Sequence, residues 1–186
     1  MTARADIPLS APLSLPTRLL HWSVALGILV MLAYGLALQW VPSGPARTAS
    51  VQVHKSLGLL VLALAAARLL WRWREGFPPP GPARGAWERR AARGVHAALI
   101  AASLLMPLSG IVRSLAYARP VALFGLPVIP QIFAEKQERL YALAAGLHDG
   151  LAWVLAGLVA LHGAAALKHH WLDRDGTLRR MLGLGR

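Results

Sequence analysis

The sequence contains no cysteine, and this absence excludes several kinds of structural and redox site. The chain forms no disulfide, no thiolate metal site and no cysteine-ligated iron–sulfur cluster. Histidine, which occurs seven times, is left as the main soft metal ligand. Long serine-, glutamine- or acid-rich tracts are also missing, so we expect disorder only near the ends.

Acidic residues are scarce: 8 Asp and Glu stand against 20 Lys and Arg, which gives a net charge of +12. A nucleic-acid-binding protein would gather such charge along one stripe, whereas here the basic residues lie between apolar runs. The 186 residues are 56% hydrophobic, which is too apolar for a soluble domain of this length. The composition therefore predicts a membrane protein.

Four apolar segments, at about 19–41, 51–71, 94–112 and 140–167, each meet the requirement of about 20 apolar residues for a membrane span. We therefore predict an all-α fold, an integral membrane four-helix bundle, as a single domain over residues 1–186. Its helices are expected at about 18–41, 51–73, 94–116 and 140–170.

The connections between these segments are rich in proline. A tight turn is expected at 42–45, so that the first two helices form a hairpin, and a break at 78–82. Residues 118–133 are predicted to form an irregular loop at the membrane surface.

The basic residues predict the orientation. With the N-terminus in the cytoplasm, the cytoplasmic segments and Arg68 hold 14 of the 20 basic residues. Short loops follow the positive-inside rule, so both termini are expected to be cytoplasmic. The expected location is the bacterial inner (cell) membrane, with the chain crossing it several times and in contact with lipid.

The histidines are the candidate functional residues, because ionisable side chains inside a membrane are costly. In the predicted topology, the inner ends of the helices carry His21, His96 and His162, and the outer ends carry His54 and His148.

His148 and His162 are 14 residues apart on one predicted helix. On an α-helix, two residues at this spacing point within about 40° of the same direction and are separated by a rise of about 21 Å. One helix thus offers two imidazoles at two depths, and each depth has histidines on other helices. The outer layer pairs His54 with His148, and the inner layer offers His162 with either His21 or His96. Haem iron takes axial ligands from two sides, and facing helices of a bundle can supply them.

Three other residues share these faces. Gly35 and Gly110 each lie 14 residues beyond an inner histidine, and a missing side chain there lets a flat macrocycle approach, although glycine also serves helix packing. Arg68 lies 14 residues beyond His54, where it either neutralises a haem propionate or extends its charge to the interface.

Two alternative readings of the histidines remain. Interfacial roles without a metal are open for His96, His169 and His170. A zinc site requires several ligands at one depth, and the inner end offers His21, His96, His162 and His169.

Three stretches carry a family resemblance: residues 18–22 (Arg-Leu-Leu-His-Trp), 53–55 (Val-His-Lys) and 161–171 (Leu-His-Gly-Ala-Ala-Ala-Leu-Lys-His-His-Trp). With the four histidine positions, they resemble the bacterial cytochrome b561 family over about residues 15–182. The resemblance implies a dihaem cytochrome with two haem b groups. In the family pattern His21 pairs with His162, and His54 pairs with His148.

The resemblance also implies an activity, the oxidation of superoxide at the outer haem with transfer of electrons to ubiquinone. The family pattern for quinone binding uses a histidine matched by His169 and a basic residue of the loop between the second and third helices. That loop position is Ala83 here, with Arg84 beside it, which departs from the pattern. His169 lies seven residues beyond His162, about 20° off its face and about 10 Å nearer the cytoplasm.

The predicted activity is therefore that of a superoxide:ubiquinone oxidoreductase. The alternative is an electron-transfer subunit that links a dehydrogenase or hydrogenase, as redox partner protein, to the quinone pool. A haem or zinc carrier is a third reading, which the two-layer pairing disfavours. A net positive outer surface is compatible with both the oxidoreductase and the electron-transfer subunit. Lys55 and Arg113 are expected to attract the superoxide anion. The charged residues of that surface are Arg47, Lys55, Arg113, Arg119, Lys136 and Arg139 against Glu135, Glu138 and Asp149.

Overall fold

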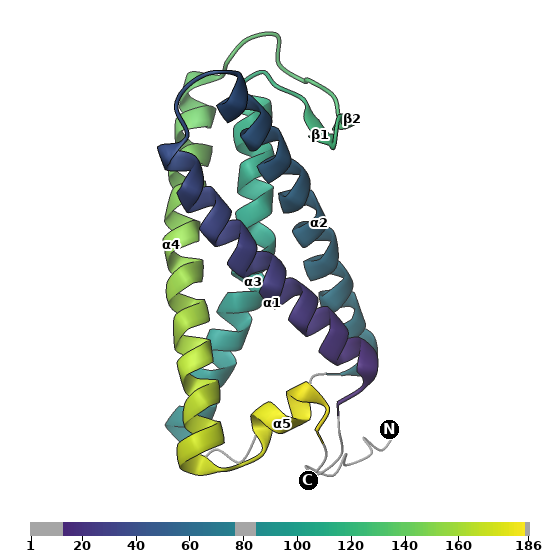
Figure 1. Ribbon diagram of the computed structural model, residues 1–186, viewed down its shortest axis with the longest axis vertical. Helices are drawn as coiled ribbons and strands as arrows, with labels where there is room; N and C mark the ends of the chain where they lie inside the picture. The colour runs from purple at the N-terminus through teal and green to yellow at the C-terminus, as the bar shows by residue number, and fades with distance from the viewer. Residues whose placement is uncertain (1–12, 77–84, 185–186) are drawn as a thin grey trace.

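The computed structural model describes residues 13–76 and 85–184, and four long helices make up most of them (Figure 1). They are α1 (Leu15–Ala37), α2 (Pro45–Glu75), α3 (Ala86–Ala116) and α4 (Glu138–Lys168). All four are long and apolar enough to cross a membrane. The prediction of four apolar spanning helices is confirmed.

The helices extend beyond the apolar segments that predicted them. α2 begins at Pro45 rather than near 51, and α3 begins at Ala86 rather than near 94. The extra turns are polar or charged, so hydropathy marks the part of each helix suited to the membrane and not its ends. Pro45 is favoured in a first turn, where its missing N–H is not needed.

The connections differ in regularity. α1 continues as a 3₁₀ turn, η1 (Leu38–Trp40), and the chain then reverses through Gly44, whose φ of 143° suits glycine. The tight turn expected at 42–45 is therefore present. The break expected at 78–82 lies outside the described residues.

The prediction of an irregular loop over 118–133 is wrong in part. Two short antiparallel strands, β1 (Val121–Leu123) and β2 (Leu126–Ile129), form a hairpin there, so the fold is not purely helical. The turn uses Phe124 and Gly125, both with positive φ. Val121 is only 2% exposed where β1 packs against α2 and α3, and this packing was not visible in the proline-rich sequence.

After α4 the chain makes a π-helical turn, η2 (His169–Asp173), and then the short helix α5 (Thr177–Leu182). α5 folds back across one end of the bundle (Figure 1). There the indole Nε1 of Trp22 on α1 donates a hydrogen bond to the carbonyl oxygen of Met181, at 2.9 Å. We call this the inner end, and the opposite end, which carries the β1–β2 hairpin, the outer end.

The core lies between the two ends. It is formed by small and branched apolar side chains: Val24, Ile28, Val61, Ala65, Ala102 and Leu155. The outward faces are apolar too, and Leu143 and Trp153 of α4 are 73% and 71% exposed. A bundle in water would not present such a surface along a whole helix, whereas lipid accommodates it.

Candidate functional site

The outer end brings together the rings of His54 on α2 and His148 on α4. Their centroids are 6.3 Å apart and their planes are inclined by 75°. A metal–imidazole bond of about 2 Å, plus about 1.1 Å from the ligating nitrogen to the ring centroid, puts the centroids of two imidazoles on opposite sides of one metal about 6.2 Å apart. The spacing of His54 and His148 therefore fits a shared iron.

Neighbours on α3 orient the ring of His148. Its Nδ1 lies 3.0 Å from the hydroxyl oxygen of Ser109 and 3.2 Å from the carbonyl oxygen of Met106. A carbonyl acceptor keeps the proton on Nδ1, which leaves Nε2 free to bind a metal. The Nδ1 of His54 is buried and has no hydrogen-bond partner. Nothing in the spacing of the histidines pointed to Ser109 or Met106.

The glycines singled out in the sequence lie against these rings. A Cβ atom on Gly110 would lie 3.0 Å from Cε1 of His148, and a Cβ atom on Gly35 would lie 3.4 Å from Cε1 of His54. Any side chain at Gly110 would therefore displace the ring. The prediction that both glycines lie in the outer layer is confirmed.

A cavity of about 920 Å³ surrounds the outer pair, and both histidines and both glycines line it. Its volume lies within the range of roughly 300–1,000 Å³ found for ligand pockets. Most of its remaining lining is apolar, including Ile28, Met31 and Leu155. An apolar cavity with two facing imidazoles fits a flat apolar macrocycle with a central metal.

The inner end brings three histidines close together. The ring centroids of His21 and His162 are 6.2 Å apart, again close to the spacing for a shared iron, whereas those of His96 and His162 are 5.3 Å apart. His96 is also exposed, whereas His21 and His162 are partly buried. The geometry thus fits His21 better than His96 as the partner of His162.

Arg68 lies at this inner end, as its spacing from His54 predicted. It is partly buried and close enough to His21, His96 and His162 for their charges to interact. Within residues 13–76 and 85–184, no three or more histidine, aspartate or glutamate side chains are arranged to hold a metal ion. The inner geometry therefore offers a pair of imidazoles beside a cation.

His169 lies just beyond the inner pair, in η2, and faces two carboxylates. Its Nδ1 is 2.7 Å from Oδ2 of Asp175 and 3.2 Å from Oδ2 of Asp173. The chain returns to His169 because Arg174 adopts the left-handed conformation, with φ 51°, and Asp175 N–H donates to the His169 carbonyl oxygen. The sequence pattern identified His169 but missed Asp175.

The remaining predicted quinone residue, Arg84, lies outside the described residues. His170 packs against the neighbouring indole of Trp171, with ring centroids 6.3 Å apart.

Cations and tyrosines form part of the lining of the outer cavity. Its lining includes the basic residues Arg47, Lys55, Arg113 and Arg119 and the carboxylate of Asp149. Arg113 is paired with Asp149 at 3.1 Å, and Arg119 lies over the ring of Tyr117, 4.3 Å from its centroid. The lining keeps a positive surplus, although the charge of Arg113 is partly offset.

Lys136 lies over the rings of Tyr117 and Tyr141, which line this cavity, and its charge is partly offset by Glu138 at 2.7 Å. A hydrogen bond to Glu138 raises the pKa of the Lys136 ammonium, so it stays charged at neutral pH. Neither tyrosine was singled out from the sequence.

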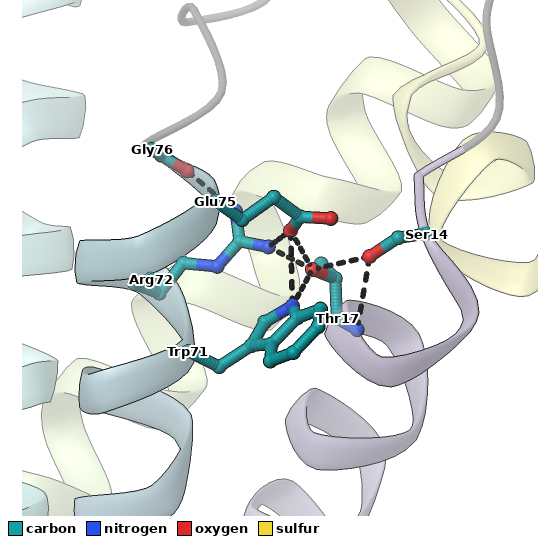
Figure 2. A network of polar contacts seen from close by, with 6 residues as sticks. All are labelled: Ser14, Thr17, Trp71, Arg72, Glu75 and Gly76. Carbon is teal, nitrogen blue, oxygen red and sulfur yellow. Dashed lines mark hydrogen bonds and ion pairs between the residues drawn. The ribbon is translucent and has the colours of Figure 1, made fainter.

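A partly buried polar network joins the inner ends of α1 and α2, and the sequence did not predict it (Figure 2). The Thr17 hydroxyl lies between the Arg72 guanidinium and the Glu75 carboxylate, which are also paired with each other. The indole Nε1 of Trp71 donates to Thr17 Oγ1 and Glu75 Oε2, both at 3.1 Å. Arg72 is only 6% exposed, so the network satisfies a charge that is buried near the inner pair.

The fold and the facing imidazoles define a helical-bundle membrane protein of the cytochrome type. The sequence profile described as prokaryotic cytochrome b561 matches residues 13–184. The chain therefore belongs to the prokaryotic cytochrome b561 family.

Individual relatives agree with this assignment. The chain is 35% identical over 170 residues to "Cytochrome b561 homolog 2" of Escherichia coli (strain K12), which covers 88% of this chain and 87% of that protein. It is 30% identical over 164 residues to "Cytochrome b561 homolog 1" of the same organism, with 88% and 92% covered. It is 28% identical over 164 residues to "Probable superoxide oxidase CybB" of Yersinia pestis, with 88% and 91% covered.

Membership in this family, with four helices suited to span a membrane, makes the chain a multi-pass inner-membrane protein that transfers electrons and binds b-type haem. The sequence-based predictions of the family, the membrane location and the haem are confirmed at this level.

Proposed function

We propose that this protein is a superoxide:ubiquinone oxidoreductase that holds two haem b groups, one at each end of the bundle. In this proposal both termini are cytoplasmic, so the outer end faces the periplasm. The balanced reaction takes one electron from each of two superoxide anions, releases two O₂, and reduces one ubiquinone to ubiquinol with two protons from the cytoplasm.

The observation that carries the proposal is that two pairs of histidines face each other, with ring centroids 6.3 Å apart in the outer pair and 6.2 Å apart in the inner pair. We assign His54 and His148 to the outer haem and His21 and His162 to the inner haem. His148 and His162 lie 14 residues apart on α4, which corresponds to a rise of about 21 Å. Bound haem supplies the one-electron iron couple, and the protein sets the distance between the two groups.

The outer residues have a separate role in this scheme. Lys55 and Arg119 line the outer cavity, and the surplus positive charge raises the local concentration of a small anion. Arg113 contributes less than its formal charge because Asp149 neutralises part of it. The glycines leave room beside both rings, and the apolar lining keeps water away.

The inner residues suit quinone chemistry. The Nε2–H of His169 is the donor we assign to a quinone carbonyl oxygen, while Oδ2 of Asp175 lies 2.7 Å from Nδ1 of the same ring. The Asp173 carboxylate, which also pairs with Lys168, supports the same ring. Arg68 offsets the negative charge of haem propionates beside the inner pair. Arg84 remains the second proposed quinone residue.

A relative named as a probable superoxide oxidase supports this reaction, at 28% identity. The second candidate function is an electron-transfer subunit that delivers electrons from a dehydrogenase or hydrogenase to quinone. The more similar relatives carry only the cytochrome name, which is compatible with that role.

The test uses purified full-length protein in liposomes that contain a ubiquinone analogue. Superoxide generated outside should reduce the haems within the mixing time, and quinol should then form at one molecule per two superoxide anions consumed. If superoxide leaves the haems oxidised while a co-purified dehydrogenase and its substrate reduce them, the subunit function replaces this proposal.

A further inference from the structure

The loop between α3 and α4 contains an uncharged, strongly apolar stretch that the proposed function does not use. Residues 120–134 contain no Asp, Glu, Lys or Arg, and Gln131 is their one polar side chain. Several of their large apolar side chains are exposed: Phe124 is 62%, Leu126 72%, Val128 55% and Ile132 57% exposed. A loop in water rarely exposes so many apolar side chains together.

The depth of this stretch is set by its attachment to α2. The Ser56 hydroxyl accepts a hydrogen bond from the Phe124 N–H at 2.8 Å and lies 3.3 Å from the Ala122 carbonyl oxygen. The 31 residues of α2 span about 46 Å, so a centred hydrocarbon layer of about 30 Å begins roughly 8 Å from the helix end. Ser56 is 11 residues from Pro45, or about 16 Å, and therefore lies inside that boundary.

Figure 1 shows the two strands beside the outer part of α2, lower in the view than the loop that joins them to α4. The hairpin therefore descends along the flank of the bundle instead of covering its end. On α2, Val53 and Leu60, three residues before and four after Ser56, are themselves exposed apolar side chains.

The backbone of the hairpin is adapted to surroundings with little water. Hydrocarbon tolerates irregular backbone only where its polar groups find partners within the protein. The Ser56 hydroxyl accepts from the Phe124 N–H at the turn, and the Pro120 carbonyl oxygen accepts from Lys55 Nζ at 3.2 Å and from Ser114 Oγ at 3.3 Å. Pro127 and Pro130 have no N–H to leave unpaired.

The turn itself carries a strained aromatic residue. Phe124 has φ 48° and Gly125 has φ 92°, a combination for which asparagine or glycine is the usual first residue. A left-handed conformation costs a residue with a side chain about 1–2 kcal/mol. Here it places a phenyl ring at the tip of the hairpin, where it is mostly exposed. Such strain suggests that the ring has a binding role.

We propose that the β1–β2 hairpin is a re-entrant anchor whose Phe124, Leu126 and Val128 side chains contact the lipid acyl chains of the outer leaflet. Lipid is the occupant favoured by the absence of charge, the depth of Ser56 and the exposed apolar side chains of α2. Because Ser56 lies two residues from His54, the anchor also holds the outer end of α2 beside the histidine pair.

The cysteine-free chain makes a direct test possible. Leu126→Cys introduces a single thiol for an environment-sensitive fluorophore, and Val128→Cys provides a second site on the same strand. Glu135→Cys, at an exposed charged position just past the stretch, is the matched control. Each labelled full-length protein is placed in nanodiscs that hold one copy, with aqueous iodide or lipids carrying a quencher within the acyl chains.

Labels at 126 and 128 should emit at shorter wavelength than the label at 135, be quenched by the lipid-borne quencher, and show several-fold less iodide quenching. Iodide quenching equal to that of the control would overturn the proposal. So would protection in crowded liposomes that disappears in single-copy nanodiscs, since the face would then contact a second copy of the chain. An unchanged haem spectrum verifies folding, and these readouts do not depend on superoxide or quinone activity.

Discussion

The Nδ1 atom of His148 lies 3.2 Å from the carbonyl oxygen of Met106, one helical turn before Gly110. α3 therefore both orients this imidazole, through a carbonyl group, and leaves room for it, through a glycine. The two contacts fix the ring of His148 from one side while Nε2 stays available.

Gly110→Ala should disrupt the outer haem site, because the new Cβ would lie 3.0 Å from Cε1 of His148. We expect the haem content to fall from two towards one per chain, or the outer haem to become high-spin, as seen in optical and EPR spectra. Gly146→Ala, at an exposed position of α4 with nothing within 4 Å, is the control. Equal behaviour of the two variants would show that the outer site tolerates a displaced ring.

The four proposed ligands should divide into two independent pairs. Pyridine haemochrome analysis should find close to two haems per chain in the unaltered protein. Loss of His54 or His148 to alanine should remove the outer haem, and loss of His21 or His162 should remove the inner one. His96→Ala should keep both, because its ring lies only 5.3 Å from that of His162 and is exposed. A haem lost in His96→Ala but kept in His21→Ala would reverse the inner assignment.

His169→Ala should slow quinone reduction while superoxide still reduces both haems at the original rate. A hydrogen bond between neutral groups contributes about 0.5–1.5 kcal/mol, so we expect a loss of roughly 2- to 10-fold. Asp175→Asn should give a smaller loss, because the side chain 2.7 Å from the ring keeps its shape and loses only its charge. His170→Ala, beside Trp171, is the control. Unchanged kinetics in His169→Ala would move the quinone site towards His170 or Arg84.

The rate of haem reduction by superoxide should fall as salt is added, because the screening length shortens from about 10 Å at 0.1 M to about 3 Å at 1 M. Arg119→Gln should lower the rate at low salt and flatten the dependence, since Arg119 lines the outer cavity. Arg90→Gln, at the inner end, should change neither. Stopped-flow absorbance of the haem band measures all three. A rate independent of salt would argue against electrostatic attraction of the donor.

Thr17→Val should destabilise the inner end of the bundle, because it removes the hydroxyl shared by Arg72, Glu75 and Trp71. Leaving buried polar groups unpaired costs about 1–3 kcal/mol, which a lowered Tm in detergent would reveal. Thr48→Val removes only an exposed hydroxyl in the first turn of α2, and should change stability by less than about 0.5 kcal/mol. A similar Tm for both variants would mean that water replaces the network.

Hydropathy and helical periodicity are local properties, and they were sufficient for the four spans and for the depths of the histidines. His148 and His162 lie on one helix, so their separation follows from residue count alone. The same count placed Gly35 and Gly110 in the outer layer, where the structure finds them against the rings. The site could be predicted this far because an α-helix repeats regularly.

Contacts between distant segments depended on the tertiary structure. Residue count left His21 and His96 as equal candidates, and only the arrangement of α1 and α3 in the bundle gives them different distances from His162. Asp175 reaches His169 through a π-helical turn and a left-handed residue, which no helical spacing describes. The hairpin forms in a proline-rich stretch because Ser56, far away in sequence, bonds to its turn. Local chemistry sets which residues enter the membrane and at what depth, whereas helix packing sets which side chains meet there.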